Sequence, residues 1–206
     1  MRTTFASVLV FGALAAISGC EDSKNGGDVA SADSKAGAAA SDFTTRDTKG
    51  NTFRLSDHLG KEAILIDFWA TWCQPCIAEM PHLQRMYDAK KGQGFLVVAV
   101  SMDGPESMPD VTSFGSRNNL TFPILLDEDS RIASTYNPRK SAPLSVLIDK
   151  NGKIAAVREG YNPGDEAYLE KDVDKVLAPS AAAPVTTTAT VTASAAPAAS
   201  TTPPAK

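Results

Sequence analysis

Cysteine and histidine are scarce in this chain of 206 residues, with three of the former and two of the latter. Three cysteines are too few for a fold stapled by disulfides. A zinc site usually takes four ligands, and outside the cysteines only His58 and His82 offer typical zinc-binding side chains, so neither a metal nor a cofactor is expected. No block of lysine and arginine interleaves with aromatic residues, and acidic residues outnumber basic ones by 24 to 20, which argues against nucleic acid as a partner.

The N-terminal apolar run, 5–17, is too short to span a bilayer and follows Arg2, as the apolar part of an export signal does. The next residues, Ile-Ser-Gly-Cys at 17–20, resemble a bacterial lipobox, in which cleavage falls before the cysteine and the thiol is diacylated. An ordinary secretory signal is the alternative, but no good Ala-x-Ala site follows the run. The sequence therefore predicts a signal peptide over 1–19 and a lipid on Cys20.

Two segments of biased composition flank a more typical globular sequence. Residues 20–42 are rich in Ser, Ala, Gly, Asp and Lys without apolar periodicity, which predicts a flexible linker behind the lipid anchor. From 178 to 206 the chain consists largely of Ala, Thr, Pro and Ser, so that it cannot bury a core and is expected to form a disordered tail. The folded domain should therefore occupy 43–177.

The sequence Trp72-Cys73-Gln74-Pro75-Cys76 carries the clearest chemical signal. The apolar run that precedes it, 63–71, has the character of a buried parallel strand. A Cys-x-x-Cys that opens a helix after such a strand places its first thiol where unpaired backbone N–H groups and the helix dipole favour a thiolate. The second thiol lies close enough to close a disulfide, so the pattern indicates thiol–disulfide exchange.

Apolar periodicity and turn residues divide the domain into alternating strands and helices. Residues 43–53 suggest a β-hairpin around the turn at 49–51, and Asn151-Gly152 predicts a second hairpin turn. The expected class is α/β, with a central mixed sheet covered by helices on both faces. Strands are expected over 63–68, 95–100, 122–126, 144–148 and 154–157, and helices over 74–90, 108–118, 130–136 and 165–177.

The segment 64–76, Ile-Leu-Ile-Asp-Phe-Trp-Ala-Thr-Trp-Cys-Gln-Pro-Cys, is similar to the active-site segment of thioredoxins. With Met80-Pro81 after it, it resembles more closely the membrane-anchored TlpA/ResA group. The stretch 142–154, Ala-Pro-Leu-Ser-Val-Leu-Ile-Asp-Lys-Asn-Gly-Lys-Ile, resembles that group's strand after a cis-proline. The resemblance covers about 43–177 and implies a thioredoxin fold with an N-terminal hairpin and an insertion between the second strand and the cis-proline strand.

The resemblance also implies roles for the residues around the two thiols. Cys73 is the expected nucleophile and Cys76 the resolving thiol, with Pro75 between them at an early helix position that needs no N–H. Asp67 stands in a continuous apolar strand and corresponds to a buried carboxylate that exchanges a proton with the resolving thiol. The alternative for Asp67 is a strand-edge position that reaches water or a lysine. Glu79, on roughly the face of Cys76, is either a second acid near the thiols or a solvated helix residue.

Client recognition is expected at Trp72 and at Ala142-Pro143. Trp72 is expected in an apolar collar that excludes water and docks a partner. The bond before Pro143 is cis by resemblance and leaves the backbone of Ala142 free to pair with an extended substrate, whereas an ordinary trans proline opening a strand is the alternative. Leu144 stands where the family often has Thr or Glu.

The resulting hypothesis is a thiol–disulfide oxidoreductase in the bacterial cell envelope, anchored through Cys20 and facing the periplasm or extracytoplasmic space. It would reduce protein disulfides, with apocytochrome c as one candidate client, and would take electrons from a membrane donor. A thiol peroxidase is a rival, but its Pro-x-x-x-Thr-x-x-Cys setting is missing. A metal carrier using the cysteine pair is another, although no histidine follows Ser101.

Overall fold

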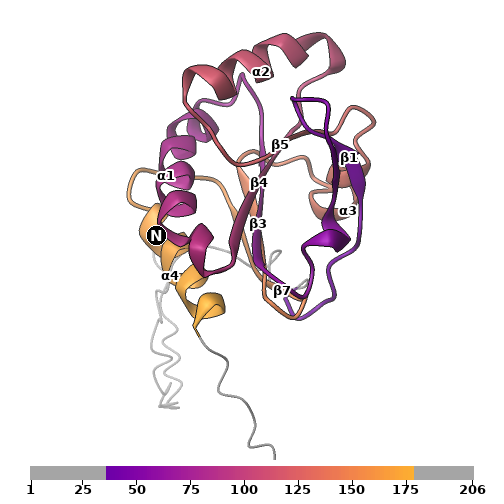
Figure 1. Cartoon of the computed structure of the whole chain (residues 1–206). Coiled ribbons are helices and arrows are strands. Elements are labelled where there is room, and N and C mark those ends of the chain that lie inside the picture. Colours follow the sequence, from indigo (N-terminus) through magenta and orange to yellow (C-terminus); the bar gives the residue numbers. More distant parts are fainter. Residues whose placement is uncertain (1–35, 179–206) are drawn as a thin grey trace, which may run out of the picture.

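The computed structural model describes residues 36–178 and contains one five-stranded sheet, one two-stranded sheet and four α-helices in that part of the chain (Figure 1). The large sheet has the order β5-β4-β3-β6-β7. Its strands are β3 (Ala63–Trp69), β4 (Phe95–Ser101), β5 (Ile124–Leu126), β6 (Leu144–Ile148) and β7 (Ile154–Glu159). The helices are α1 (Gln74–Lys90), α2 (Met108–Arg117), α3 (Arg131–Tyr136) and α4 (Glu166–Leu177).

The mixed sheet expected from the sequence is confirmed, and β3 lies at its centre. It pairs in parallel with β4 and antiparallel with β6, so that all seven of its residues are buried. A strand covered on both faces and both edges reads as a continuous apolar run, which is what the sequence shows at this point. β5 begins two residues later than expected, because Pro123 has no N–H to give to the ladder.

The two faces of the sheet carry separate apolar cores. Leu65 and Trp69 of β3 face α1, α2 and α4, whereas Ile64, Ile66 and Phe68 face α3 and the hairpin. Figure 1 shows α1 and α4 on one side of the sheet and α3 with β1 on the other. Side chains alternate between the faces of a strand, so the odd-numbered residues of β3 all point towards α1.

The N-terminal hairpin and the insertion are both present. Strands β1 (Thr44–Arg46) and β2 (Thr52–Arg54) form the hairpin, with Thr44 opposite Arg54. The insertion between β4 and the strand after Pro143 contains α2, whose Phe114 packs against Trp69 with ring centroids 4.9 Å apart. Short 3₁₀ turns lie at Leu55–Asp57, Lys91–Gln93 and Pro105–Ser107.

The structured part of the chain begins earlier than the expected boundary at residue 43. Gly37 N–H donates to Ile154 O (2.7 Å), Ala40 N–H donates to Gly152 O (2.8 Å), and Ala38 O accepts from the N–H of Ile154. These backbone bonds attach the end of the expected linker to the turn between β6 and β7. Backbone pairing of small residues needs no apolar pattern, and composition alone therefore does not reveal it.

Several sequence predictions lie outside the described residues: the signal peptide over 1–19, the lipid on Cys20, the linker up to residue 35 and the tail from 179 onward. Within 36–178, no helix has the length and apolar character needed to cross a membrane.

Candidate active site

Cys73 and Cys76 are joined in a disulfide at the N-terminal end of α1, with an S–S distance of 2.08 Å and a Cα–Cα distance of 5.3 Å. Cys73 is the N-cap residue of the helix, and its Sγ accepts a hydrogen bond from the backbone N–H of Cys76 at 3.3 Å. Cys73 retains 5 % exposure and Cys76 none. In the reduced form, the helical N–H and the positive end of the dipole at this sulfur would favour a thiolate on Cys73.

The turn that leads into α1 is held by residues that the sequence did not single out. Asp103, just after β4, accepts hydrogen bonds from the backbone N–H of Thr71 (3.0 Å) and from its Oγ1 (2.6 Å). Ser101 Oγ donates to the same carboxylate at 2.9 Å. Pro75 fits the first turn of α1, where an N–H would have no helical acceptor. Asp103 thus fixes the backbone two residues before Cys73, and no local pattern in the sequence signals that contact.

Asp67 is fully buried in the middle of β3, which excludes the strand-edge alternative. Its Oδ1 accepts a hydrogen bond from Ser145 Oγ at 2.9 Å, on the neighbouring strand β6, while Oδ2 has no partner. Burial raises the pKa of Asp67 to about 7, against the smaller opposing effect of the Ser145 hydrogen bond. The carboxyl group therefore gains and loses its proton near neutral pH, on the face of β3 against which Cys76 packs.

Glu79 is only 6 % exposed, so the alternative of a solvated helix residue does not hold. Its Oε2 has no hydrogen-bond partner. Burial is the main reason why the pKa of Glu79 rises to about 9, and the negative charges of Asp67, Asp165 and Glu166 add to it. The site therefore contains two buried carboxyl groups that repel each other when both are ionised.

Of the residues expected to bind the client, Trp72 directly precedes Cys73, and Ala142-Pro143 leads into β6, the neighbour of β3. The Ala142–Pro143 peptide bond is cis, as the resemblance implies, and Leu144 directly after it pairs with Phe68 of β3. Trp72 is 67 % exposed, which is unusual for so large an apolar side chain. A hollow of about 270 Å³ lies beside it, lined by Trp72, Met102, Asp127, Ser130, Ala133 and Lys140.

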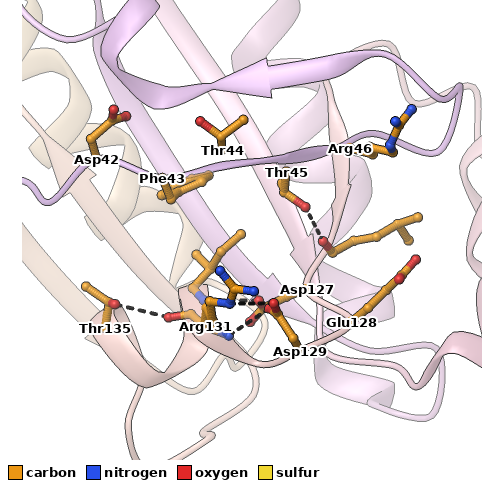
Figure 2. Close-up of a pocket in the computed structure, with 12 residues that line it drawn as sticks. Asp42, Phe43, Thr44, Thr45, Arg46, Asp127, Glu128, Asp129, Arg131 and Thr135 are labelled. Carbon is orange, nitrogen blue, oxygen red and sulfur yellow. Dashed lines mark hydrogen bonds and ion pairs between the residues drawn. The ribbon is translucent and has the colours of Figure 1, made fainter.

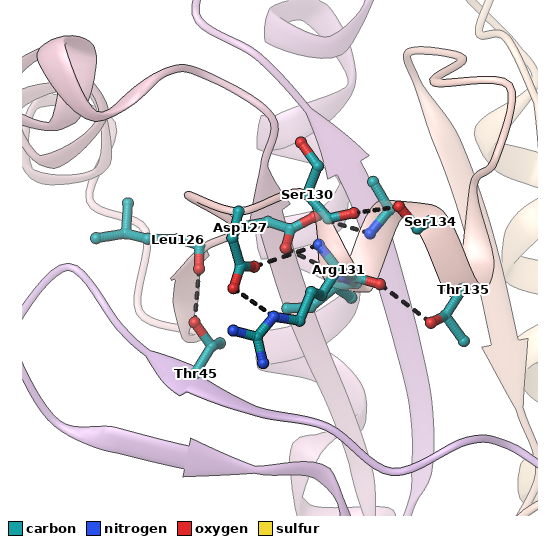
Figure 3. Close-up of polar contacts among 10 residues, drawn as sticks. Thr45, Leu126, Asp127, Ser130, Arg131, Ser134 and Thr135 are labelled. Atoms are coloured by element: carbon teal, nitrogen blue, oxygen red, sulfur yellow. Dashed lines mark hydrogen bonds and ion pairs between the residues drawn. The ribbon is translucent and has the colours of Figure 1, made fainter.

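A second hollow, of about 510 Å³, lies between the hairpin and the segment that leads into α3 (Figure 2). Neither cysteine lines it. Thr45 Oγ1 donates to Leu126 O (2.6 Å), and Ser134 Oγ donates to Ser130 O (2.6 Å) (Figure 3). Asp127 accepts from the backbone N–H groups of Ile132 and Ala133 at the start of α3. These polar groups hold the hairpin and α3 in place, and we assign this hollow no part in the reaction.

Metal binding was a rival use of the cysteine pair. In the region from 36 to 178, no three His, Cys, Asp or Glu side chains are grouped so that they could hold a metal ion. His58 instead lies beside Glu62 at 2.7 Å, and His82 lies 3.6 Å from Glu166.

Comparison with known sequences finds thiol–disulfide oxidoreductases among the relatives of this chain. A sequence model of the AhpC/TSA family matches residues 36–157. "Thiol-disulfide oxidoreductase ResA" of Geobacillus kaustophilus is 40 % identical over 124 residues, which cover 60 % of this chain and 69 % of the relative. The protein of the same name from Halalkalibacterium halodurans is 35 % identical over 147 residues, covering 71 % of this chain and 80 % of the relative.

Solved structures agree with these relatives. A Chlorobium tepidum protein assigned as thiol:disulfide interchange protein DsbE superposes with a TM-score of 0.63 at 33 % identity, over 69 % of this chain and 97 % of that one. The thioredoxin domain of a thiol-disulfide oxidoreductase from Bacteroides vulgatus gives a TM-score of 0.57 at 28 % identity, over the same shares of the two chains. The thioredoxin fold expected from the sequence is therefore confirmed.

Proposed function

The chain belongs to the AhpC/TSA family and, within it, to the ResA-type thiol–disulfide oxidoreductases, and from that membership we propose that it reduces protein disulfides while anchored to the outer side of a bacterial membrane. The observation that carries the proposal is the Cys73–Cys76 disulfide at the start of α1, with the buried carboxyl group of Asp67 on the adjoining strand. This arrangement supplies a stabilised thiolate, a second thiol within reach and a proton acceptor.

The reaction begins from the dithiol form. The Cys73 thiolate attacks one sulfur of the client disulfide, the client S–S bond breaks, and a mixed disulfide forms while the released client thiolate takes up a proton. Cys76 then loses its proton to Asp67 and attacks Cys73 Sγ, which closes the enzyme disulfide and frees the second client thiolate. Two electrons pass to the client, and a membrane-bound donor returns them to the cysteine pair.

Client docking uses the surface around the exposed Trp72. An extended client segment would pair with the backbone of Ala142, before the cis-proline Pro143, and place its cysteine over Cys73. Trp72 and the adjoining hollow, with Met102 and Ala133 in its wall, would receive an apolar side chain of the client. Apocytochrome c is the candidate client that the family resemblance offers.

A direct assay tests the reductase function. We expect the full chain, reduced beforehand, to break the interchain disulfides of insulin while its own cysteine pair closes, as followed by turbidity and by thiol counting. The midpoint potential in glutathione buffers should lie nearer to the roughly −270 mV of thioredoxin than to the about −120 mV of DsbA. An intact insulin bridge together with a cysteine pair that does not cycle would refute the proposal.

The membrane anchor is tested separately. We expect mass spectrometry to find a diacylglyceryl group on Cys20 of the wild-type chain and none on Cys20→Ala, because the variant loses the residue that carries the lipid. Cys76→Ala also removes one thiol but leaves the lipobox intact, and it should keep the lipid. A wild-type chain without a lipid on Cys20 would contradict lipid anchoring at this residue.

A further inference from the structure

The loop between β7 and α4 brings charged groups close to Glu79. Tyr161 in this loop is buried, and its hydroxyl group donates to Glu166 Oε2 at 3.1 Å. Burial, the hydrogen bond to Glu166 and the charge of Glu79 all raise the pKa of Tyr161, in decreasing order. The charges of Glu79 and of Glu166 at the start of α4 therefore both act on the hydroxyl group of Tyr161.

Backbone N–H groups hold the carboxylate of Glu166 in place and stabilise its ionised form. Its Oε2 accepts a hydrogen bond from Gly164 N–H at 2.8 Å, and its Oε1 lies 3.6 Å from His82 Nδ1. Hydrogen bonds from its own backbone N–H and from that of Gly164 hold the pKa of Glu166 below its ordinary value. Glu166 consequently carries a negative charge throughout the neutral range.

A second carboxylate, that of Asp165, is held in place by hydrogen bonds from the same loop. Its Oδ2 accepts from the backbone N–H of Asn162 at 2.8 Å and from the side-chain Nδ2 at 3.2 Å. The loop thus folds so that its own donors keep two adjacent carboxylates in place.

Glu166 lies beside His82, which is three residues after Glu79 on α1, and the charges of Asp67, Asp165 and Glu166 raise the pKa of Glu79. Tyr161 is the neutral titratable group of the loop that interacts with it. On α1 itself, His82 lies beside Glu166, and Arg85 lies 2.7 Å from His82. The charges on β3 and at the start of α4 that act on the buried Glu79 are thus all negative. Its Oε2 accepts no hydrogen bond that could offset them.

We propose that Asp165 and Glu166 are positioning residues for thiol–disulfide exchange, whose negative charges reinforce the effect of burial in keeping a proton on Glu79, in the helical turn after Cys76. The inference rests on the proposed reductase function. When Cys73 attacks a client disulfide and the client S–S bond breaks, the departing thiolate takes that proton, and Glu79 becomes a carboxylate until solvent returns it. The two carboxylates at the start of α4 thereby extend to higher pH the range in which Glu79 can donate a proton.

The test is a ¹³C NMR titration of the Glu79 carboxyl group in the oxidised full chain, with the resonance assigned by its loss in Glu79→Gln. We expect Glu166→Gln and Asp165→Asn each to move the midpoint to lower pH by roughly half to one unit, as removal of one nearby charge at an intermediate dielectric constant would do. Glu170→Gln is the matched control, because this residue lies one turn further along α4, pairs with Lys90 and should leave the midpoint unchanged.

Unchanged midpoints in both Glu166→Gln and Asp165→Asn, or an equal displacement in Glu170→Gln, would overturn the inference. If Glu166→Gln does not fold, Asp165→Asn alone decides. The titration needs neither client nor turnover, so its failure in a protein that reduces insulin would count against this inference alone. Failure of the insulin assay alone would count against the reductase function and leave the electrostatic role intact.

Discussion

Cys76→Ala should hold its client in a covalent complex that the wild-type chain releases. Cys73 remains able to attack, since it occupies the N-cap position and its sulfur accepts a hydrogen bond from the backbone N–H of residue 76. Without a second thiol, nothing inside the enzyme can resolve the mixed disulfide, so the complex accumulates. Affinity purification from cells, non-reducing electrophoresis and mass spectrometry would identify the client, and apocytochrome c would be the expected partner.

Cys73→Ala is the matched variant, with the same substitution on the other cysteine. We expect insulin reduction to fall to the uncatalysed rate and no client to be trapped, because the remaining thiol of Cys76 is fully buried in the oxidised structure and lies inside the helix. Equal trapping by the two variants would show that the roles assigned to the cysteines are reversed.

The oxidised protein should become less stable as the pH rises from about 4 to about 9. Asp67 has an ordinary pKa of 3.8 and a folded value of about 7, and for Glu79 the values are 4.5 and about 9. Each group binds its proton more tightly in the folded state, so the unfolded chain carries fewer protons across this range and stability declines with pH. For each group, the loss of stability starts when the pH exceeds the pKa in the unfolded chain and is complete when the pH exceeds the pKa in the folded protein. The total decline should amount to several kcal/mol.

Glu79→Gln should remove most of the loss of folding stability that the wild-type chain shows as the pH approaches 9. The variant is expected to unfold at a higher denaturant concentration than the wild-type chain at pH 9 and to differ much less from it at pH 5. Urea titrations of the oxidised proteins at both pH values measure the effect. Glu128→Gln, the same change at an exposed position, should follow the wild-type profile. A flat wild-type profile between pH 5 and 9 would mean that Glu79 is ionised at little cost.

Elements with a strong internal period were predictable from the sequence almost to the residue. The expected bounds of α1 and β6 coincide with the observed ones, because apolar residues three and four apart define the helix and a buried apolar run defines the strand. For Asp67 the sequence left a buried position and a strand-edge position open, and the structure places it in the buried centre of the sheet. The disulfide and the cis peptide bond also agree with the resemblance that the motifs carry.

Contacts between distant segments were not predictable. The position of Glu79 relative to Cys76 gives only a shared helical face, and its burial depends on how α1 packs in the folded domain. Asp103 binds the backbone of Thr71 across 32 positions, and nothing in either local sequence requires it. The sequence shows two acidic residues at the start of α4, but the spacing of polar residues in a loop does not tell where the loop lies. That these two residues act on Glu79 therefore became visible only in the structure.

The attachment of residues 37–40 to the turn between β6 and β7 determines which end of the domain a tether would hold. Ile148 at the end of β6 lies opposite Ile64, near the beginning of β3, whereas the cysteines follow the other end of that strand. The entry point and the disulfide are thus separated by roughly 20 Å, the length of a strand of this size. A lipid on Cys20 would therefore attach the domain through the end of the sheet opposite the cysteines, so that the attachment itself does not cover the disulfide.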